Sequence, residues 1–135
     1  MSFEFPVRIY WEDTDAGGIV FYANYLKFFE RARTEWLRSL GFSQQLLREQ
    51  TGGMFVVSET SVRYLRPARL DDELIVTARL ETSGSASMII AQQARQRLSG
   101  QLLAEGTIRI GWVEATTLRP ARIPDNVIQT LSVNA

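Results

Sequence analysis

The most constraining feature of the sequence is one long amphipathic segment in its first third. From Asn24 to Leu40 the apolar side chains recur at three- and four-residue steps and are bulky: Tyr25, Phe28, Phe29, Ala32, Trp36, Leu37 and Leu40. This spacing predicts an α-helix of about four and a half turns with one buried face. Gly41 follows in the position expected of a C-terminal cap. Such a helix cannot bury its own bulky face, so other parts of the chain must cover it.

Most of the remaining chain has the composition of β-strands. Residues 3–11 alternate apolar and polar positions ahead of the helix. After it, four segments rich in Val, Ile, Thr and aromatic residues are each bounded by turn residues: 55–65, 73–81, 87–98 and 102–113. Ser99-Gly100 predicts a hairpin between the last two strands. Short helices are expected near residues 43–50 and 125–131.

The order of these elements predicts an α+β fold. We expect a strand, the long helix, and then four strands in a meander, forming a five-stranded antiparallel sheet wrapped around one central helix. No composition change or linker divides the chain, so residues 1–135 are expected to form a single domain. A sheet of this kind leaves edge strands that must be paired or covered, which favours a homo-oligomer.

The composition excludes several classes of protein. The 135 residues contain no histidine and no cysteine, which removes Ser-His-Asp and Cys-His catalysis and the usual transition-metal ligands, so no metal is expected. The 15 basic and 15 acidic residues balance, which argues against a nucleic-acid binder with a broad basic surface. No apolar run is long enough to span a membrane and no secretory signal begins the chain, so we expect a cytoplasmic location.

The loop between the first strand and the long helix has residues suited to catalysis. Residues 12–18 read Glu-Asp-Thr-Asp-Ala-Gly-Gly, and the helix begins shortly after them. Glycines let the backbone approach a ligand, and unpaired N–H groups at a helix N-terminus can stabilise an oxyanion. A nearby carboxylate could attack a carbonyl or activate water, which suffices for ester or thioester hydrolysis without histidine.

Two other interpretations of this loop were weighed. Asp13 and Asp15 are also common turn formers, and Gly17-Gly18 could be only a sharp bend. A calcium loop is rejected, because the glycine and closing glutamate are not at the spacing that an EF-hand requires.

Three segments resemble the hotdog-fold acyl-CoA thioesterases, of the Tol–Pal-associated and 4-hydroxybenzoyl-CoA thioesterase family. They are the run from Trp11 to Tyr25, the helical Phe29-Glu30-Arg31-Ala32-Arg33-Thr34-Glu35, and the later Arg66-Pro67-Ala68-Arg69-Leu70-Asp71-Asp72. The resemblance extends from about Phe5 to Pro124, and it implies the hotdog fold, no cofactor, and hydrolysis of a short-chain aliphatic or aryl acyl-CoA.

The resemblance also implies roles for individual residues. Asp15, the second aspartate of the motif, matches the family's catalytic carboxylate, as nucleophile or general base. The backbone N–H of Tyr22 matches the group that polarises the thioester carbonyl, and Gly17 and Gly18 shape the turn between them. Asp13 is expected to be structural or to support the site from behind.

Further substrate contacts are expected outside the loop. Coenzyme A carries phosphates, and arginine matches phosphate geometry, so Arg66 and Arg69 are candidates to bind it. Ser58 lies on a strand that, in the family, passes near the site of the partner subunit, and its hydroxyl is a candidate substrate contact.

The chain departs from the Tol–Pal-associated subfamily at Phe21-Tyr22, where those enzymes usually have tyrosine-histidine. The histidine's role is then vacant or passes to the Tyr22 hydroxyl. An alternative function is therefore a non-catalytic module of the same fold that binds acyl-CoA or acyl carrier protein. The sequence does not determine which acyl groups are preferred, whether the thiol carrier is CoA or a carrier protein, or whether the oligomer is a dimer or a tetramer.

Overall fold

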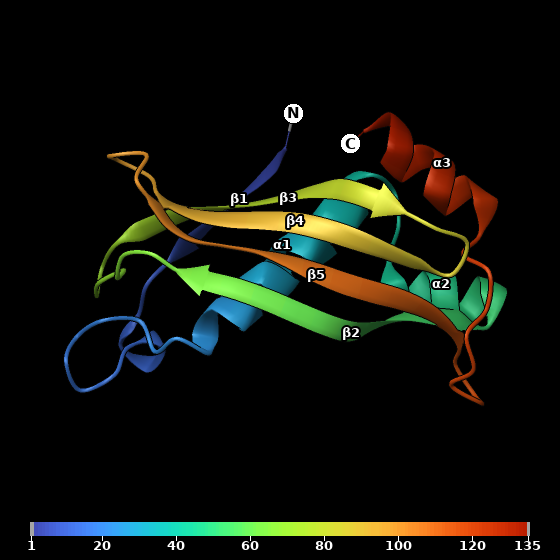
Figure 1. The fold of residues 1–135 in the computed structure, drawn as a ribbon, viewed down its shortest axis with the longest axis horizontal. Helices are drawn as coiled ribbons and strands as arrows, with labels where there is room; N and C mark the ends of the chain where they lie inside the picture. The colour runs from blue at the N-terminus through green and yellow to red at the C-terminus, as the bar shows by residue number, and fades with distance from the viewer. Residues whose placement is uncertain (1, 135) are drawn as a thin grey trace.

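The computed structural model describes residues 2–134. The elements in chain order are β1 (Phe3–Arg8), the 3-10 helix η1 (Trp11–Asp13), α1 (Asn24–Ser39), α2 (Gln44–Thr51), β2 (Gly53–Tyr64), β3 (Glu73–Ser83), β4 (Ser87–Gln96), β5 (Leu102–Glu114) and α3 (Asp125–Val133). The sheet curves in front of α1, which crosses behind the strands at an angle (Figure 1). This is the expected hotdog arrangement, a five-stranded antiparallel sheet around one long helix.

The strand order corrects one prediction. The strand order in the sheet is β1-β3-β4-β5-β2. Strands β3, β4 and β5 form a meander as predicted, but β2, which was expected to pair with β3, does not. Instead β2 pairs with β5, with Phe55 opposite Trp112. The free side of β3 is already taken by β1, where Phe5 lies opposite Val76. Sequence adjacency suggested the meander, but the competing β1–β3 pairing leaves β2 as an edge strand.

The core lies between α1 and the inner face of the sheet. The helix buries the predicted side chains from Tyr25 to Leu37, with Phe28 and Phe29 fully buried, and packs on β1, β3 and β4, whereas Leu40 follows the end of the helix and is only partly buried. The even-numbered residues 74–80 of β3 and 88–94 of β4 are buried against it, among them Val76 and Ile90. Each strand therefore turns one face to the helix, as the two-residue repeat of a β-strand requires.

The ends of the helices follow from local sequence. Gly41, just after α1, has a φ of 91°, which glycine adopts without the strain that a Cβ would bring. Ser43 caps α2, because its Oγ accepts a hydrogen bond from the Leu46 amide at 3.3 Å. None of the helices within residues 2–134 is long and apolar enough to cross a membrane.

Candidate active site

The segment between β1 and α1 is held together by Asp13. Its side chain is buried, and Oδ2 accepts a hydrogen bond from the Tyr10 amide at 2.8 Å. Its carbonyl oxygen accepts bonds from the Phe21 amide at 3.0 Å and from Asn24 Nδ2 at 2.8 Å. Asp13 therefore ties the end of β1 to the start of α1, which is a structural contribution.

Asp15 has the opposite environment, since its side chain is exposed to solvent. Its Oδ1 accepts the Gly17 amide at 2.8 Å, and its carbonyl accepts the Gly18 amide at 3.1 Å. Gly18 has a φ of 79°, so this tight turn needs a residue without Cβ strain. The turn orients the carboxylate and leaves Oδ2 without a partner within residues 2–134.

The start of α1 presents free backbone donors. Asn24 and Tyr25 donate their amides to the carbonyls of Phe21 and Tyr22, which closes the first turn. In the part of the chain that the structure describes, the amides of Tyr22 and Ala23 meet no acceptor. Unpaired amides at the positive end of a helix dipole are suited to a developing negative charge.

The loop between β2 and β3 lies alongside the Asp15 turn. The Val20 amide donates to the Ala68 carbonyl at 2.9 Å, and the Leu70 amide donates to the Gly18 carbonyl at 3.2 Å. Ile19 and Arg69 form an isolated β-bridge between the two segments. Arg66 and Arg69 are thus brought to the same end of the molecule as Asp15, both exposed and, among residues 2–134, without an ion-pair partner.

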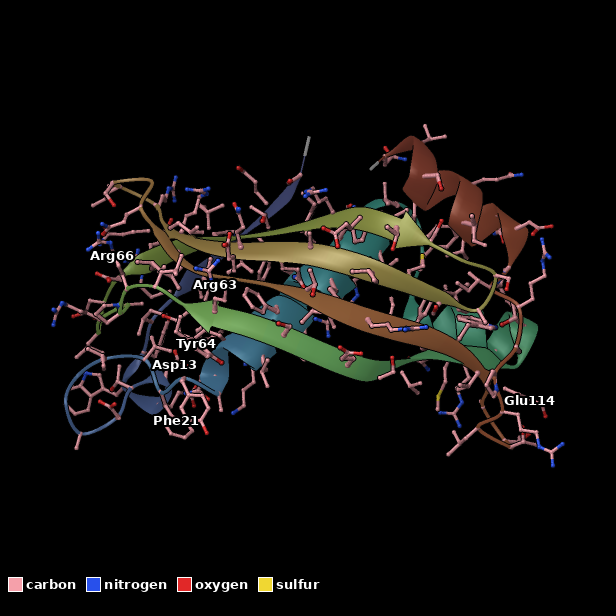
Figure 2. The ribbon with its side chains drawn as sticks, in the orientation of Figure 1. Asp13, Phe21, Arg63, Tyr64, Arg66 and Glu114 are labelled. Carbon is pink, nitrogen blue, oxygen red and sulfur yellow. The ribbon has the colours of Figure 1, made fainter. Side chains whose placement is uncertain are left out.

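A cavity of about 240 Å³ opens beside Tyr22. Its walls come from the loop, α1 and the end of β2: Ile19, Val20, Tyr22, Tyr25, Tyr64, Leu65, Arg66 and Pro67. Figure 2 shows Asp13, Phe21 and Tyr64 together at this end of the sheet, with Glu114 at the other end. Tyr22 and Arg66 thus line the cavity, whereas Asp15 and Arg69 lie on the adjoining loops and are not among its lining residues.

The sequence reasoning did not single out Tyr64 for the site. Its ring packs edge-on against Tyr22 with centroids 5.9 Å apart and lies 5.6 Å from the ring of Tyr25. Burial raises the pKa of the Tyr25 hydroxyl above its ordinary value, opposed by a hydrogen bond from the Ala68 backbone. Desolvation, and then the nearby Tyr22, raise the pKa of Tyr64. The available signal was an aromatic residue at the end of a strand, just before the Arg66-Pro67 turn.

Ser58 is not brought to this region within one chain. It lies at a bulge in β2 between Val57 and Glu59, and its Oγ donates to the Arg109 carbonyl at 3.3 Å. Ser58 and Tyr64 are six positions apart on the strand, about 20 Å along β2. Its proposed contact with substrate thus depends on a second copy of the chain.

Acidic side chains do not form a metal site here. Asp13 turns its carboxylate inward and Asp15 turns its own to solvent. Over residues 2–134, no group of three acidic side chains is close enough to hold a metal ion.

Comparison with known proteins agrees with this geometry. A profile of the thioesterase-like superfamily matches residues 9–131. The acyl-CoA thioesterase YbgC of Haemophilus influenzae is 41% identical over 126 residues, covering 93% of this chain and 91% of that protein. The acyl-CoA thioester hydrolase YbgC of Escherichia coli is 39% identical, covering 93% of this chain and 92% of that protein.

A solved structure extends the similarity to the fold. The 1,4-dihydroxy-2-naphthoyl-CoA thioesterase Slr0204 from Synechocystis superposes with a TM-score of 0.90, covering 98% of this chain and 96% of that chain. At 21% identity this likeness supports the fold alone. The resemblance noted in the sequence is confirmed, and the chain belongs to the thioesterase-like superfamily.

Proposed function

We propose that this protein is an acyl-CoA thioesterase that works with Asp15 and the backbone amide of Tyr22. One observation carries the proposal: a carboxylate oriented by Gly17 and the unpaired amide at the start of α1 lie on the same short loop. Asp13 bonds both ends of that loop and so limits its movement. Preorganised groups of this kind cost no rearrangement when charge develops.

The reaction would proceed at the thioester carbonyl. The Tyr22 amide, at the positive end of the α1 dipole, stabilises the negative charge that develops on the carbonyl oxygen. Asp15 either attacks the carbonyl carbon, forming a mixed anhydride that water then hydrolyses to restore the carboxylate, or removes a proton from a water that attacks the carbonyl directly. The carbon–sulfur bond breaks, CoA leaves as the thiolate, and water supplies the hydroxyl of the free acid. A thiolate is a good leaving group, so no histidine is needed to protonate it in advance.

The remaining expected residues would bind the substrate. Gly17 and Gly18 would keep the backbone beside Asp15 open to the thioester, and Arg66 and Arg69 would contact CoA phosphates. Ser58 would reach the substrate of a second copy in a homodimer or homotetramer. We propose that the enzyme acts in the cytoplasm on acyl-CoA thioesters, with carrier-protein thioesters as the alternative substrate.

The decisive variant is Asp15→Asn. The Asn side-chain oxygen can still accept the Gly17 amide, so the turn should persist while the negative charge is lost. We expect kcat to fall at least about 100-fold with an unchanged circular dichroism spectrum. Asp125→Asn is the matched control, since Asp125 is an exposed aspartate in α3 that pairs with Arg122. Full turnover by Asp15→Asn would overturn the assignment of Asp15.

A second measurement separates hydrolysis from simple binding. Free thiol release is followed with a thiol reagent across aliphatic and aryl acyl-CoAs and an acylated carrier protein. Catalysis predicts release well above the uncatalysed rate for at least one substrate. Tight binding of acyl-CoA without release from any of them would replace the proposed function by a binding role.

A further inference from the structure

Trp11 is unusually exposed for a tryptophan. Its side chain is 81% exposed, whereas Trp36 and Trp112 are each 3% exposed. Trp11 begins η1, whose last residue is the buried Asp13, so its backbone is anchored to the Asp15 loop. A large aromatic surface held rigidly in solvent beside a candidate active site is typical of a binding surface.

A hollow of about 560 Å³ lies against this side chain. It is lined by Arg8, Ile9, Tyr10, Trp11, Glu12 and Asp71. Two aromatic rings supply stacking surface, and within residues 2–134 the carboxylates of Glu12 and Asp71 have no hydrogen-bond or ion-pair partner. The guanidinium of Arg8 is already engaged by the Asp71 carbonyl and Glu73, each at 2.8 Å. The Glu12 and Asp71 carboxylates are therefore free hydrogen-bond acceptors in the hollow, beside the Tyr10 hydroxyl and the Trp11 indole N–H.

Asp71 is held in a strained turn that also contains Arg69. Its φ is 70°, which is uncommon for a residue with a side chain. The Arg69 amide donates to Asp72 Oδ2 at 2.9 Å, and the Asp72 amide returns a bond to the Arg69 carbonyl at 3.1 Å. The Asp71 amide binds the Ile9 carbonyl at 3.0 Å, which fixes the turn beside η1. The Cα atoms of Arg69 and Asp71 thus lie within about 7 Å of each other in one turn, with a cationic and an anionic side chain on it.

We propose that this hollow binds the adenine ring of coenzyme A. The ring would stack on Trp11, and its exocyclic amine would donate to the free carboxylate of Asp71 or Glu12. A purine amine is a donor and matches these acceptors, whereas a phosphate would be repelled by them. The phosphates belong instead near Arg69, at the other end of the same turn. The inference rests on the proposed function, since it takes acyl-CoA as the substrate.

The first experiment compares a full and a truncated substrate. An acyl-CoA and the N-acetylcysteamine thioester of the same acid share the reacting bond, but the second lacks the nucleotide. We expect Trp11→Ala to raise KM for the acyl-CoA about tenfold and to leave kcat/KM for the truncated thioester unchanged. Trp11→Phe should retain much of the affinity through its ring, and Val133→Ala, at an exposed position of α3, serves as the surface control.

The acceptor role of Asp71 is tested separately. Asp71→Asn keeps a side chain that tolerates a positive φ but offers a weaker, uncharged acceptor. We expect Asp71→Asn to raise KM for the acyl-CoA. The increase in KM should be smaller with the 1,N6-etheno analogue, because its amine is blocked and cannot donate to residue 71. If Asp71→Asn and Trp11→Ala each lowered kcat/KM equally for the acyl-CoA and for the truncated thioester, the adenine site would be overturned.

Tryptophan fluorescence tests the site without relying on turnover. Because Trp36 and Trp112 are buried, saturable quenching by free CoA should come mainly from Trp11 and disappear in Trp11→Phe. Quenching without hydrolysis would support the adenine site while removing the proposed function. Absence of CoA quenching, or protection of Trp11 from acrylamide by a second copy of the chain, would overturn the adenine site itself.

Discussion

At the scale of single residues, Gln92 organises the interior beneath α1. Its fully buried amide nitrogen donates to the carbonyls of Phe29 in α1 and Thr77 in β3, at 3.0 and 3.2 Å. Its Oε1 accepts a bond from Arg33 Nη1 at 2.9 Å. Arg33 turns inward to make this contact, unlike Arg38, which pairs with Glu35 on the surface of α1. Burial lowers the pKa of Arg33, with the charge of Glu30 opposing this.

Replacing Gln92 should therefore be costly. Gln92→Leu removes both helix and strand contacts and leaves the half-buried Arg33 without an acceptor, so we expect a loss of about 2–4 kcal/mol. Urea unfolding followed by circular dichroism measures it. The double variant Gln92→Leu with Arg33→Met should lose less free energy of unfolding than the two single variants together, because both changes remove the same contact. Gln93→Leu, on the outer face, is the control, and an equal loss there would contradict this role for Gln92.

At the scale of elements, Glu73 joins three parts of the sheet. It begins β3 and forms ion pairs with Arg8 of β1 and with Arg97, just beyond β4. These partners are within reach because β1 and the β4–β5 hairpin flank the start of β3.

This arrangement predicts an acid-dependent contribution to stability. The Arg97 hydrogen bond lowers the pKa of Glu73 below its ordinary 4.5; desolvation, the second-largest effect, opposes this, and the charges of Arg97 and Arg8 add to the lowering. A lowered carboxyl pKa stabilises the fold above about pH 4.5, and this contribution is lost as the pH falls through the folded-state value.

Glu73→Gln tests that contribution by thermal unfolding. We expect a small decrease in Tm at pH 7 that shrinks on acidification and in high salt, since the pairs are exposed. Glu81→Gln provides the control, because Glu81 is exposed and has no ion pair within residues 2–134. A Tm difference for Glu73→Gln that stays constant from pH 7 to pH 3 would be inconsistent with the charge effect.

At the scale of the whole molecule, β2 leaves one edge of the sheet open. It is 12 residues long, pairs with β5 on one side, and lies at the lower edge in Figure 1. Within residues 2–134, no strand pairs with its other side. Val57, in the middle of this strand, is 53% exposed. A long open edge with an exposed apolar side chain favours pairing with a second copy, which supports the proposed homo-oligomer.

Val57→Asp should weaken that assembly. The wild type is expected to elute as a dimer or tetramer, and the variant should shift toward the monomer because a carboxylate at the interface is desolvated. Light scattering coupled to size-exclusion chromatography measures the mass. Leu98→Asp, at a position that is 96% exposed in the β4–β5 turn, is the control. A monomeric wild type would overturn the oligomer and, with it, the contact of Ser58 with a partner's substrate.

Local patterns in the sequence predicted most elements and part of the site. The α1 periodicity, the strand alternation and the Ser99-Gly100 hairpin all agree with the structure, because each depends on neighbours in the chain. The Asp15 turn was recognisable from its motif. Its proposed catalytic role remains a prediction until the Asp15→Asn variant is measured.

The sequence by itself determined the α+β class, the buried face of α1 and the family motif, since periodicity and motif spacing are properties of short segments. Only the tertiary structure decided that β2 lies beside β5, that Tyr64 packs on Tyr22, and that Arg69 lies beside Ile19. These contacts join residues far apart in the chain. They form because strand edges and loop amides compete for partners as the core closes. The outcome of that competition depends on the whole fold and cannot be seen in any short segment of sequence.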